Sequence, residues 1–282
     1  MRYRRIGDVK VSAIGLGGMG LSVAGRPDRD AAIATVHAAL DAGITFIDTA
    51  DAYTTSADGQ GHNESLIAEA LRGRTEQVLV ATKGGLVFRD GGPWDRAGSP
   101  AQLAASARAS ATRLGVDAIG LYQFHRPDPT VPYEDSIGAL AQLLADGVIR
   151  MVGISNATVA QIEIADHVLG GRLVSVQNQL SPAYRTSEPE LDHCAEREIA
   201  FLPWSPLGGI ARASDLGDEH AVFGEVAREL GVSAQRVTLA WELALQHNVI
   251  PIPGARRAES IRDSALAADL VLTASELERL GA

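Results

Sequence analysis

The chain has 282 residues, 46% of them hydrophobic, and a formal net charge of −10 at pH 7. This length can bury a large core, and we interpret residues 1–282 as one domain. The acidic charge argues against nucleic acid or an anionic membrane as a partner. Cys194 is the only cysteine, so no intramolecular disulfide can form, and the lack of a Cys pair or His cluster predicts no metal site.

Eight short apolar runs rich in β-branched residues alternate with stretches of helical period. The runs end at Gly18, Asp48, Thr82, Phe124, Ile154, Gln177, Pro203 and Ile252. The helical stretches are 30–41, 65–72, 100–114, 133–144, 159–169 and 234–247. Strand and helix in alternation predict a parallel sheet, and continuously apolar strands indicate that both of its faces are covered. Eight repeats favour a (β/α)8 TIM barrel, with an open doubly wound sheet as the alternative.

Polar residues gather where these apolar runs stop. They are Asp48, Lys83, His125, Ser155, Asn156, Gln177, Asn178, Trp204, Ser205 and the segment 254–257. In a barrel, the ends of parallel strands converge on one face, where active sites lie. The opening segment YRRIGDVKVSAIG has a turn at Gly7 and Asp8 between two extended pieces. It predicts an N-terminal β-hairpin that closes the bottom of the barrel.

Two glycine-containing segments bear on nucleotide binding. GLGGMG at 15–20 fits G-x-G-x-x-G, but the next helical pattern begins only near Asp30, so a dinucleotide-binding Rossmann helix is disfavoured. The segment IPGARR at 252–257 ends the last run and leads into a helical stretch, 258–268. Glycine followed by arginines at the last barrel strand suits phosphate, and a guanidinium fork favours the 2′-phosphate of NADP over the hydroxyl of NAD.

Four residues at successive strand ends carry acid–base chemistry: Asp48, Tyr53, Lys83 and His125. A free phenol has a pKa of roughly 10, and we expect the Lys83 ammonium to lower the pKa of Tyr53. Asp48 would keep Lys83 protonated in a dry pocket. His125 would orient a carbonyl group, so that the four residues together could protonate a carbonyl oxygen.

The chain resembles the aldo-keto reductase superfamily along its whole length. FIDTADAY, VLVATKGG, LYQFHRPDP, VGISN, VQN, LPWSPLGG and IPGARR occur in the order that the superfamily has them. The resemblance implies a TIM barrel and reduction of an aldehyde or ketone by NADPH, with Tyr53 as the general acid. The catalytic residues it implies are Asp48, Tyr53, Lys83 and His125.

The resemblance also implies a cofactor site along the strand ends. Ser155, Asn156 and Gln177 would bind the nicotinamide carboxamide, and Trp204 would stack on its ring. Ser205, Leu207 and Gly209 would follow the pyrophosphate. Gly18, Met19 and Asp48 complete the cofactor set, with Gly254, Ala255, Arg256, Ser260 and Asp263 at the adenosine end. Asp263-Ser264 stands where the superfamily commonly has Glu-Asn, so the adenine contacts depart from its pattern.

The substrate is expected to be a small carbonyl compound. Loops 84–99, with Phe88 and Trp94, and 204–219 would shape its pocket, and few clustered cations surround it, although Arg126 beside His125 could meet an acidic group. An alcohol or sugar dehydrogenase working in the oxidative direction, an NADP-binding regulatory subunit and a Schiff-base aldolase using Lys83 are the alternatives. Without a signal peptide or transmembrane stretch, we expect a cytoplasmic protein. No heptad seam indicates an oligomeric state.

Overall fold

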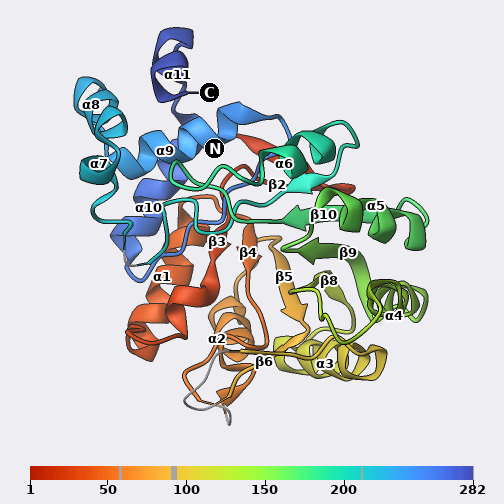
Figure 1. The fold of residues 1–282 in the computed structure, drawn as a ribbon. Coiled ribbons are helices and arrows are strands. Elements are labelled where there is room, and N and C mark those ends of the chain that lie inside the picture. Colours follow the sequence, from red (N-terminus) through yellow and green to blue (C-terminus); the bar gives the residue numbers. More distant parts are fainter. Residues whose placement is uncertain (57–58, 90–93, 211, 282) are drawn as a thin grey trace.

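The computed structural model describes residues 1–56, 59–89, 94–210 and 212–281. Its main sheet has seven parallel strands in the spatial order β11-β10-β9-β8-β5-β4-β3. Figure 1 shows that this sheet curls, with helices on its outside. The strands are β3 (Leu16–Gly17), β4 (Phe46–Asp48), β5 (Leu79–Gly84), β8 (Ile119–Phe124), β9 (Ile149–Ser155), β10 (Leu173–Gln177) and β11 (Ala200–Phe201).

Residues 249–254 lie between the two edge strands, β11 and β3. Ile250 N donates to Phe201 O at 2.9 Å, and Gly17 N donates to Pro253 O at 2.9 Å. The sequence predicted an eighth strand here, whereas the segment forms only isolated bridges to Phe201 and Gly17. Pro251 and Pro253 have no N–H to donate, which prevents a regular ladder. The contacts on both sides fit an eighth position in a (β/α)8 barrel.

The helices follow the strands along the chain. They are η1 (Gly18–Leu21), α1 (Arg29–Asp41), α2 (His62–Leu71), α3 (Pro100–Leu114), α4 (Tyr133–Ala145), α5 (Val159–Val168), α6 (Glu188–Ala195), α7 (Leu216–Glu219), α8 (Ala221–Leu230), α9 (Ala234–Leu245), α10 (Ala258–Leu266), η3 (Ala267–Asp269) and α11 (Ala274–Leu280). None of the described helices is long and apolar enough to cross a membrane.

Helix α3 shows why the predicted helical stretches match well. Ser99 caps it by accepting from Gln102 N, Pro100 occupies the first turn, and Gly115 ends it with a φ of 69°. These are the residue types that begin and end helices. Helices α6, α7 and α8 were not predicted, although Gly231 ends α8 with a φ of 68°. The short antiparallel pair β6 (Leu86–Val87) and β7 (Asp95–Arg96) in loop 84–99 was also missed, and residues 90–93 of that loop lie outside the described residues.

The segment after β3 forms the 3-10 helix η1 and no α-helix follows until Arg29. A Rossmann helix is therefore absent from this described segment. The glycines serve close packing instead, because a Cβ on Gly17 would lie 2.6 Å from Ile252 O and one on Gly18 would lie 2.6 Å from Asn63 Oδ1. The strand end can thus approach both the closing segment and α2.

The N-terminal residues form an antiparallel pair, β1 (Tyr3–Ile6) with β2 (Val9–Ser12). Ile6 and Val11 are buried in one cluster with residues of the barrel strands, among them Phe46 and Leu121. A second cluster joins the outer faces of β8 and β9 to helices α3, α4 and α5. Both faces of the parallel strands are therefore covered, as their continuously apolar sequences predicted.

Candidate active site

Three neighbouring strands bring the predicted acid–base residues together. Asp48 ends β4, Lys83 lies in β5, and His125 follows β8. Lys83 Nζ donates to Asp48 Oδ2 at 2.6 Å, to Thr49 O at 2.9 Å and to the Tyr53 hydroxyl at 3.1 Å. Lys83 has no exposed surface. Its three hydrogens are all in use, which disfavours Lys83 as the nucleophile of an aldolase.

The other oxygen of Asp48 accepts two side-chain amides. Gln177 Nε2 donates to Asp48 Oδ1 at 2.8 Å, and Gln123 Nε2 donates to the same atom at 3.3 Å. Gln123 was not singled out from the sequence, because a glutamine in the middle of an apolar strand carries no signal of its own. The buried carboxylate is thus held by one ammonium and two amides, which offset the cost of its burial.

The lysine–tyrosine pair has raised pKa values. Burial alone would lower the pKa of Lys83, but Asp48 and Tyr53 outweigh it and raise that pKa above its ordinary value. Burial raises the pKa of Tyr53 as well, and the opposing effect of the Lys83 ammonium does not cancel it. We had expected Lys83 to lower the pKa of Tyr53, and desolvation is the reason that the net direction is upward. Tyr53 therefore carries its proton at neutral pH.

His125 packs beside the Tyr53 ring. The two ring centroids are 5.7 Å apart, with planes at 84°. Burial, followed by the charges of Lys83, Arg126 and Arg96, lowers the pKa of His125 well below its ordinary value. The imidazole is therefore neutral at neutral pH, and its buried Nδ1 has no partner among the described residues. A neutral imidazole can donate one hydrogen bond to a carbonyl oxygen.

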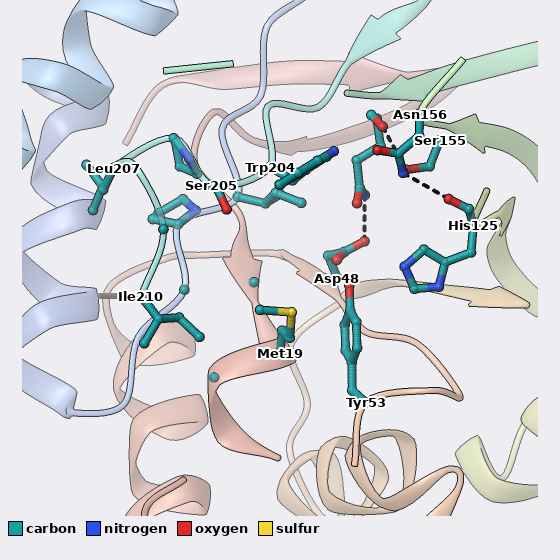
Figure 2. A pocket seen from close by; sticks show the side chains of 18 of the residues that line it. Met19, Asp48, Tyr53, His125, Ser155, Asn156, Trp204, Ser205, Leu207 and Ile210 are labelled. Atoms are coloured by element: carbon teal, nitrogen blue, oxygen red, sulfur yellow. Dashed lines mark hydrogen bonds between the residues drawn. The ribbon is translucent and has the colours of Figure 1, made fainter. Parts of the chain in front are cut away.

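These residues face a cavity of ≈ 300 Å³. Figure 2 shows Tyr53 and His125 on one side of it, with Ser205, Leu207 and Ile210 on another. The lining includes most of the predicted cofactor residues: Met19, Asp48, Ser155, Asn156, Gln177, Trp204, Ser205, Leu207, Gly209 and Gly254. Gly18, Lys83, Ala255, Arg256, Ser260 and Asp263 are not part of this lining.

Ser155 and Asn156 stand at the end of β9, next to the histidine. Asn156 Nδ2 donates to His125 O at 3.0 Å and to Ser155 Oγ at 2.9 Å, and Ser155 Oγ donates to Gln177 O at 2.7 Å. Asn156 has a φ of 58°, in the left-handed region. This backbone turn directs the amide back across the strand ends, so that the three predicted carboxamide ligands form one connected group.

The predicted adenosine-end residues lie in loop 254–257 and α10. Arg256 donates from Nε to Gly20 O of η1 at 3.3 Å and from Nη2 to Ala24 O, in the loop after η1, at 2.7 Å. Asp263 accepts from Ser233 Oγ and pairs with Arg236. Arg256 therefore ties the loop after β3 to the loop after the closing segment.

The backbone along the cavity leaves room for an extended ligand. A Cβ on Gly254 would find its nearest neighbour, Gly17 O, at 3.7 Å, and one on Gly209 would find Ser205 Oγ at 3.9 Å. A Cβ at either of these two lining positions would make no contact closer than ordinary van der Waals distance. Glycines that leave such room between Trp204 and the arginines of loop 254–257 fit a dinucleotide better than a compact ligand.

Four further lining residues, Leu86, Pro206, Ile210 and Ala213, were not named individually from the sequence. They lie in the segments 84–99 and 204–219, which were predicted to shape the pocket. Trp94 was predicted to shape the pocket and does line it, and its Nε1 donates to Ala52 O at 2.9 Å beside the Tyr53 turn. In the other predicted loop, 204–219, residue 211 lies outside the described residues.

The sequence profile of the Aldo/keto reductase family matches residues 13–282. The chain belongs to this family. Within it, the chain is 36% identical over 276 residues to the 6-dehydroglucose reductase of Novosphingobium aromaticivorans, covering 93% of this chain and 89% of that protein. The resemblance inferred from the seven motifs is therefore confirmed.

Solved structures of the family agree in fold. The glycerol dehydrogenase of Gluconobacter oxydans superposes with a TM-score of 0.85 at 28% identity, covering 99% of this chain and 94% of that one. An aldo-keto reductase of Klebsiella pneumoniae, solved in complex with NADPH, has a TM-score of 0.82 at 27% identity, with 99% and 94% covered. As a member of the family, the present chain is an NADP-dependent oxidoreductase. The arginines of loop 254–257 had predicted the same cofactor.

Proposed function

We propose that this aldo-keto reductase reduces an aldehyde or a ketone to an alcohol, with Tyr53 as the general acid. The observation that supports the proposal best is the Asp48–Lys83–Tyr53 chain of hydrogen bonds, which ends at a protonated phenol lining the cavity. A phenol beside a fixed ammonium can lose its proton and leave a stabilised phenolate. Tyr53 holds a proton at neutral pH and can therefore supply the one that reduction requires.

The cofactor would lie along the strand ends. Bound NADPH supplies the hydride. We assign Ser155, Asn156 and Gln177 to the nicotinamide carboxamide and Trp204 to its ring. The remaining assignments are Gly18, Met19, Asp48, Ser205, Leu207, Gly209, Gly254, Ala255, Arg256, Ser260 and Asp263. The side-chain nitrogen of Gln177, Nε2, donates to Asp48. The side-chain oxygen of Gln177, Oε1, is the atom that would accept a hydrogen bond from the carboxamide.

The chain's own residues would handle the charge that develops on the substrate oxygen. The Tyr53 hydroxyl donates its proton to that oxygen, and Lys83 stabilises the phenolate that remains. Neutral His125 donates a second hydrogen bond and fixes the carbonyl plane. Donors held in a buried site stabilise such charge more than they would in water, since they do not have to reorient during the reaction.

Two features of the fold belong to the same proposal. We interpret residues 1–282 as one domain, because the buried clusters join strands from both halves of the chain. We also propose that the β1–β2 hairpin closes the bottom of the barrel. Its buried Ile6 and the proximity of Gly7 to Val174 and Met151 support that placement.

The test is NADPH oxidation by purified protein with a panel of aldehydes and ketones, run in parallel on Tyr53→Phe. Reduction should be lost by roughly 10²- to 10⁴-fold in the variant, the usual contribution of a general acid, while its NADPH affinity, measured by fluorescence titration, stays unchanged. A Tyr53→Phe protein that is as active as wild type would refute the assignment of the acid.

The same assay separates the alternatives. Turnover only with NADP⁺ and an alcohol or sugar would indicate a dehydrogenase. NADPH binding without turnover in either direction would indicate a regulatory subunit. Asp48→Asn offers a further check, because a catalytic tetrad predicts lost turnover in whichever direction the wild type works.

A further inference from the structure

Arg126 is a charged residue that lines the cavity next to His125. It follows His125 in the chain and lines the same cavity as Tyr53 and Trp94. Its guanidinium carbon is 5.9 Å from the centroid of the Trp204 ring. The side chain is partly exposed, so a ligand in the cavity can reach its donors.

A second arginine strengthens the positive charge there. Burial lowers the pKa of Arg126, and the nearby charge of Arg96 lowers it further. Within the described ranges, neither guanidinium lies within 4.0 Å of a carboxylate or makes a hydrogen bond to a side chain or carbonyl. Asp95 pairs with Arg89 instead, and Asp128 accepts from Gly98 N and the Thr130 hydroxyl. Two such charges beside one pocket attract an anion even though the chain is acidic overall.

The geometry points to Arg126 as the residue that binds an anionic group, a carboxylate or a phosphate, on a small carbonyl substrate. The inference rests on the proposed function and adds the class of substrate. A guanidinium matches either anion with two parallel hydrogen bonds. The cavity of ≈ 300 Å³ must also receive the nicotinamide, so the substrate is short. The carbonyl of the substrate would contact Tyr53 and His125, and its anionic group would contact Arg126.

Matched pairs of substrates test the charge itself. One pair is 4-oxobutanoate and its methyl ester, and the other is glyceraldehyde 3-phosphate and glyceraldehyde. We expect wild type to favour the charged member of at least one pair by roughly 10- to 100-fold in kcat/KM, the range for a hydrogen-bonded charge. The carboxylate pair or the phosphate pair that shows the preference identifies the anion.

Variants at Arg126 assign the preference to that side chain. Arg126→Met should abolish it, mainly through KM for the charged substrate, while leaving the uncharged substrate and KM for NADPH unchanged. Arg126→Lys should retain part of it. Arg150→Met is the matched control, because exposed Arg150 lies at the opening of β9, whereas the site lies where that strand ends. It removes the same charge and should leave the preference as in wild type.

Three kinetic results would overturn the inference. The first is wild type that reduces both members of each pair equally well, which leaves the proposed reduction intact. The second is an Arg126→Met protein with a raised KM for NADPH and equal losses on charged and uncharged substrates, which would show that Arg126 only supports Trp204. The third is a preference that survives in Arg126→Met.

A binding measurement covers the case in which no test carbonyl is reduced. Calorimetry would compare succinate and inorganic phosphate with dimethyl succinate on the NADP⁺-saturated protein. We expect wild type to bind at least one of the two anions and not the ester, and Arg126→Met to bind none of them. Binding of neither anion by wild type would overturn the anion site independently of the reduction.

Discussion

Gln177 Nε2 donates a 2.8 Å hydrogen bond to Asp48 Oδ1, across 129 positions of the chain. Asp48 in turn holds Lys83, and Lys83 donates to the Tyr53 hydroxyl. A residue assigned to the cofactor is thereby connected to the proposed proton donor through one carboxylate. Gln123 reaches the same oxygen at 3.3 Å but does not line the cavity. The two glutamines therefore allow the cofactor role to be separated from the structural one.

We predict that Gln177→Leu and Gln123→Leu both lower the free energy of unfolding by about 1–3 kcal/mol, since each removes a donor from a buried carboxylate. Only Gln177→Leu should also raise the KM for NADPH, by roughly 10-fold, the equivalent of one lost hydrogen bond. Urea unfolding and steady-state kinetics measure the two effects. Equal KM values in both variants would argue against Gln177 as a cofactor residue.

Lys83→Met should destabilise the protein by roughly 3–5 kcal/mol, because it leaves the Asp48 carboxylate buried without its ammonium. The double variant Lys83→Met with Asp48→Asn should regain much of that stability, because no charge then remains. Both proteins should lack turnover, since neither can stabilise a Tyr53 phenolate. Urea unfolding at neutral pH gives the stabilities. A double variant as unstable as the single one would mean that packing, rather than charge, dominates this site.

Asp51 makes the stability depend on pH. Burial, with a further contribution from Glu64, raises the pKa of this carboxyl to about 7. Its Oδ1 has no partner among the described residues. The folded state therefore holds a proton that the unfolded chain releases near pH 4. The contribution of this proton to the free energy of unfolding is complete below about pH 4 and is lost as the pH rises to about 7. The change amounts to at most about 4 kcal/mol.

Asp51→Asn tests this directly. The variant should gain stability relative to wild type progressively between pH 4 and pH 7, because the asparagine side chain cannot ionise and the wild-type carboxyl does. Unfolding by urea at several pH values measures the difference between the two curves. Asp117→Asn, at an exposed position, should follow the wild-type curve. A constant difference between Asp51→Asn and wild type at all pH values would show that Asp51 has an ordinary pKa.

Gly254→Val should weaken NADPH binding without unfolding the protein. A Cβ at Gly254 meets nothing closer than 3.7 Å, and the position lines the cavity, so the valine would occupy space assigned to the cofactor. We expect the Kd for NADPH to rise by at least about 10-fold, as for a lost contact of moderate strength. Fluorescence titration measures the Kd, and thermal unfolding measures stability.

Gly17→Ala provides the contrast, because its Cβ would lie 2.6 Å from Ile252 O in the backbone of the closing segment. This variant should lose stability, since the two backbones would have to move apart. If Gly254→Val bound NADPH as tightly as wild type, the path assigned to the cofactor at this end would be wrong.

The amino-acid sequence by itself determined the order of the parallel strands and of most helices between them, and it predicted which residues would carry acid–base chemistry. Helical period, caps such as Ser99 and continuous apolar runs are local properties that depend on neighbours in the chain. The positions at which the runs stop are equally visible, and parallel strands bring those positions to one face. The sequence therefore predicts that Asp48, Lys83 and His125 lie close together.

Only the tertiary structure decided how the ring closes and which partners the buried polar groups find. The segment 249–254 sits between β11 and β3 without a strand ladder, and Gln123 joins Asp48 from the interior of β8. Arg256 donates one hydrogen bond to the carbonyl of Gly20 and one to the carbonyl of Ala24. These contacts link residues far apart in the chain and depend on strand register and barrel closure. Desolvation, which raises the pKa of Tyr53 against the effect of Lys83, likewise exists only once the surrounding strands have excluded water.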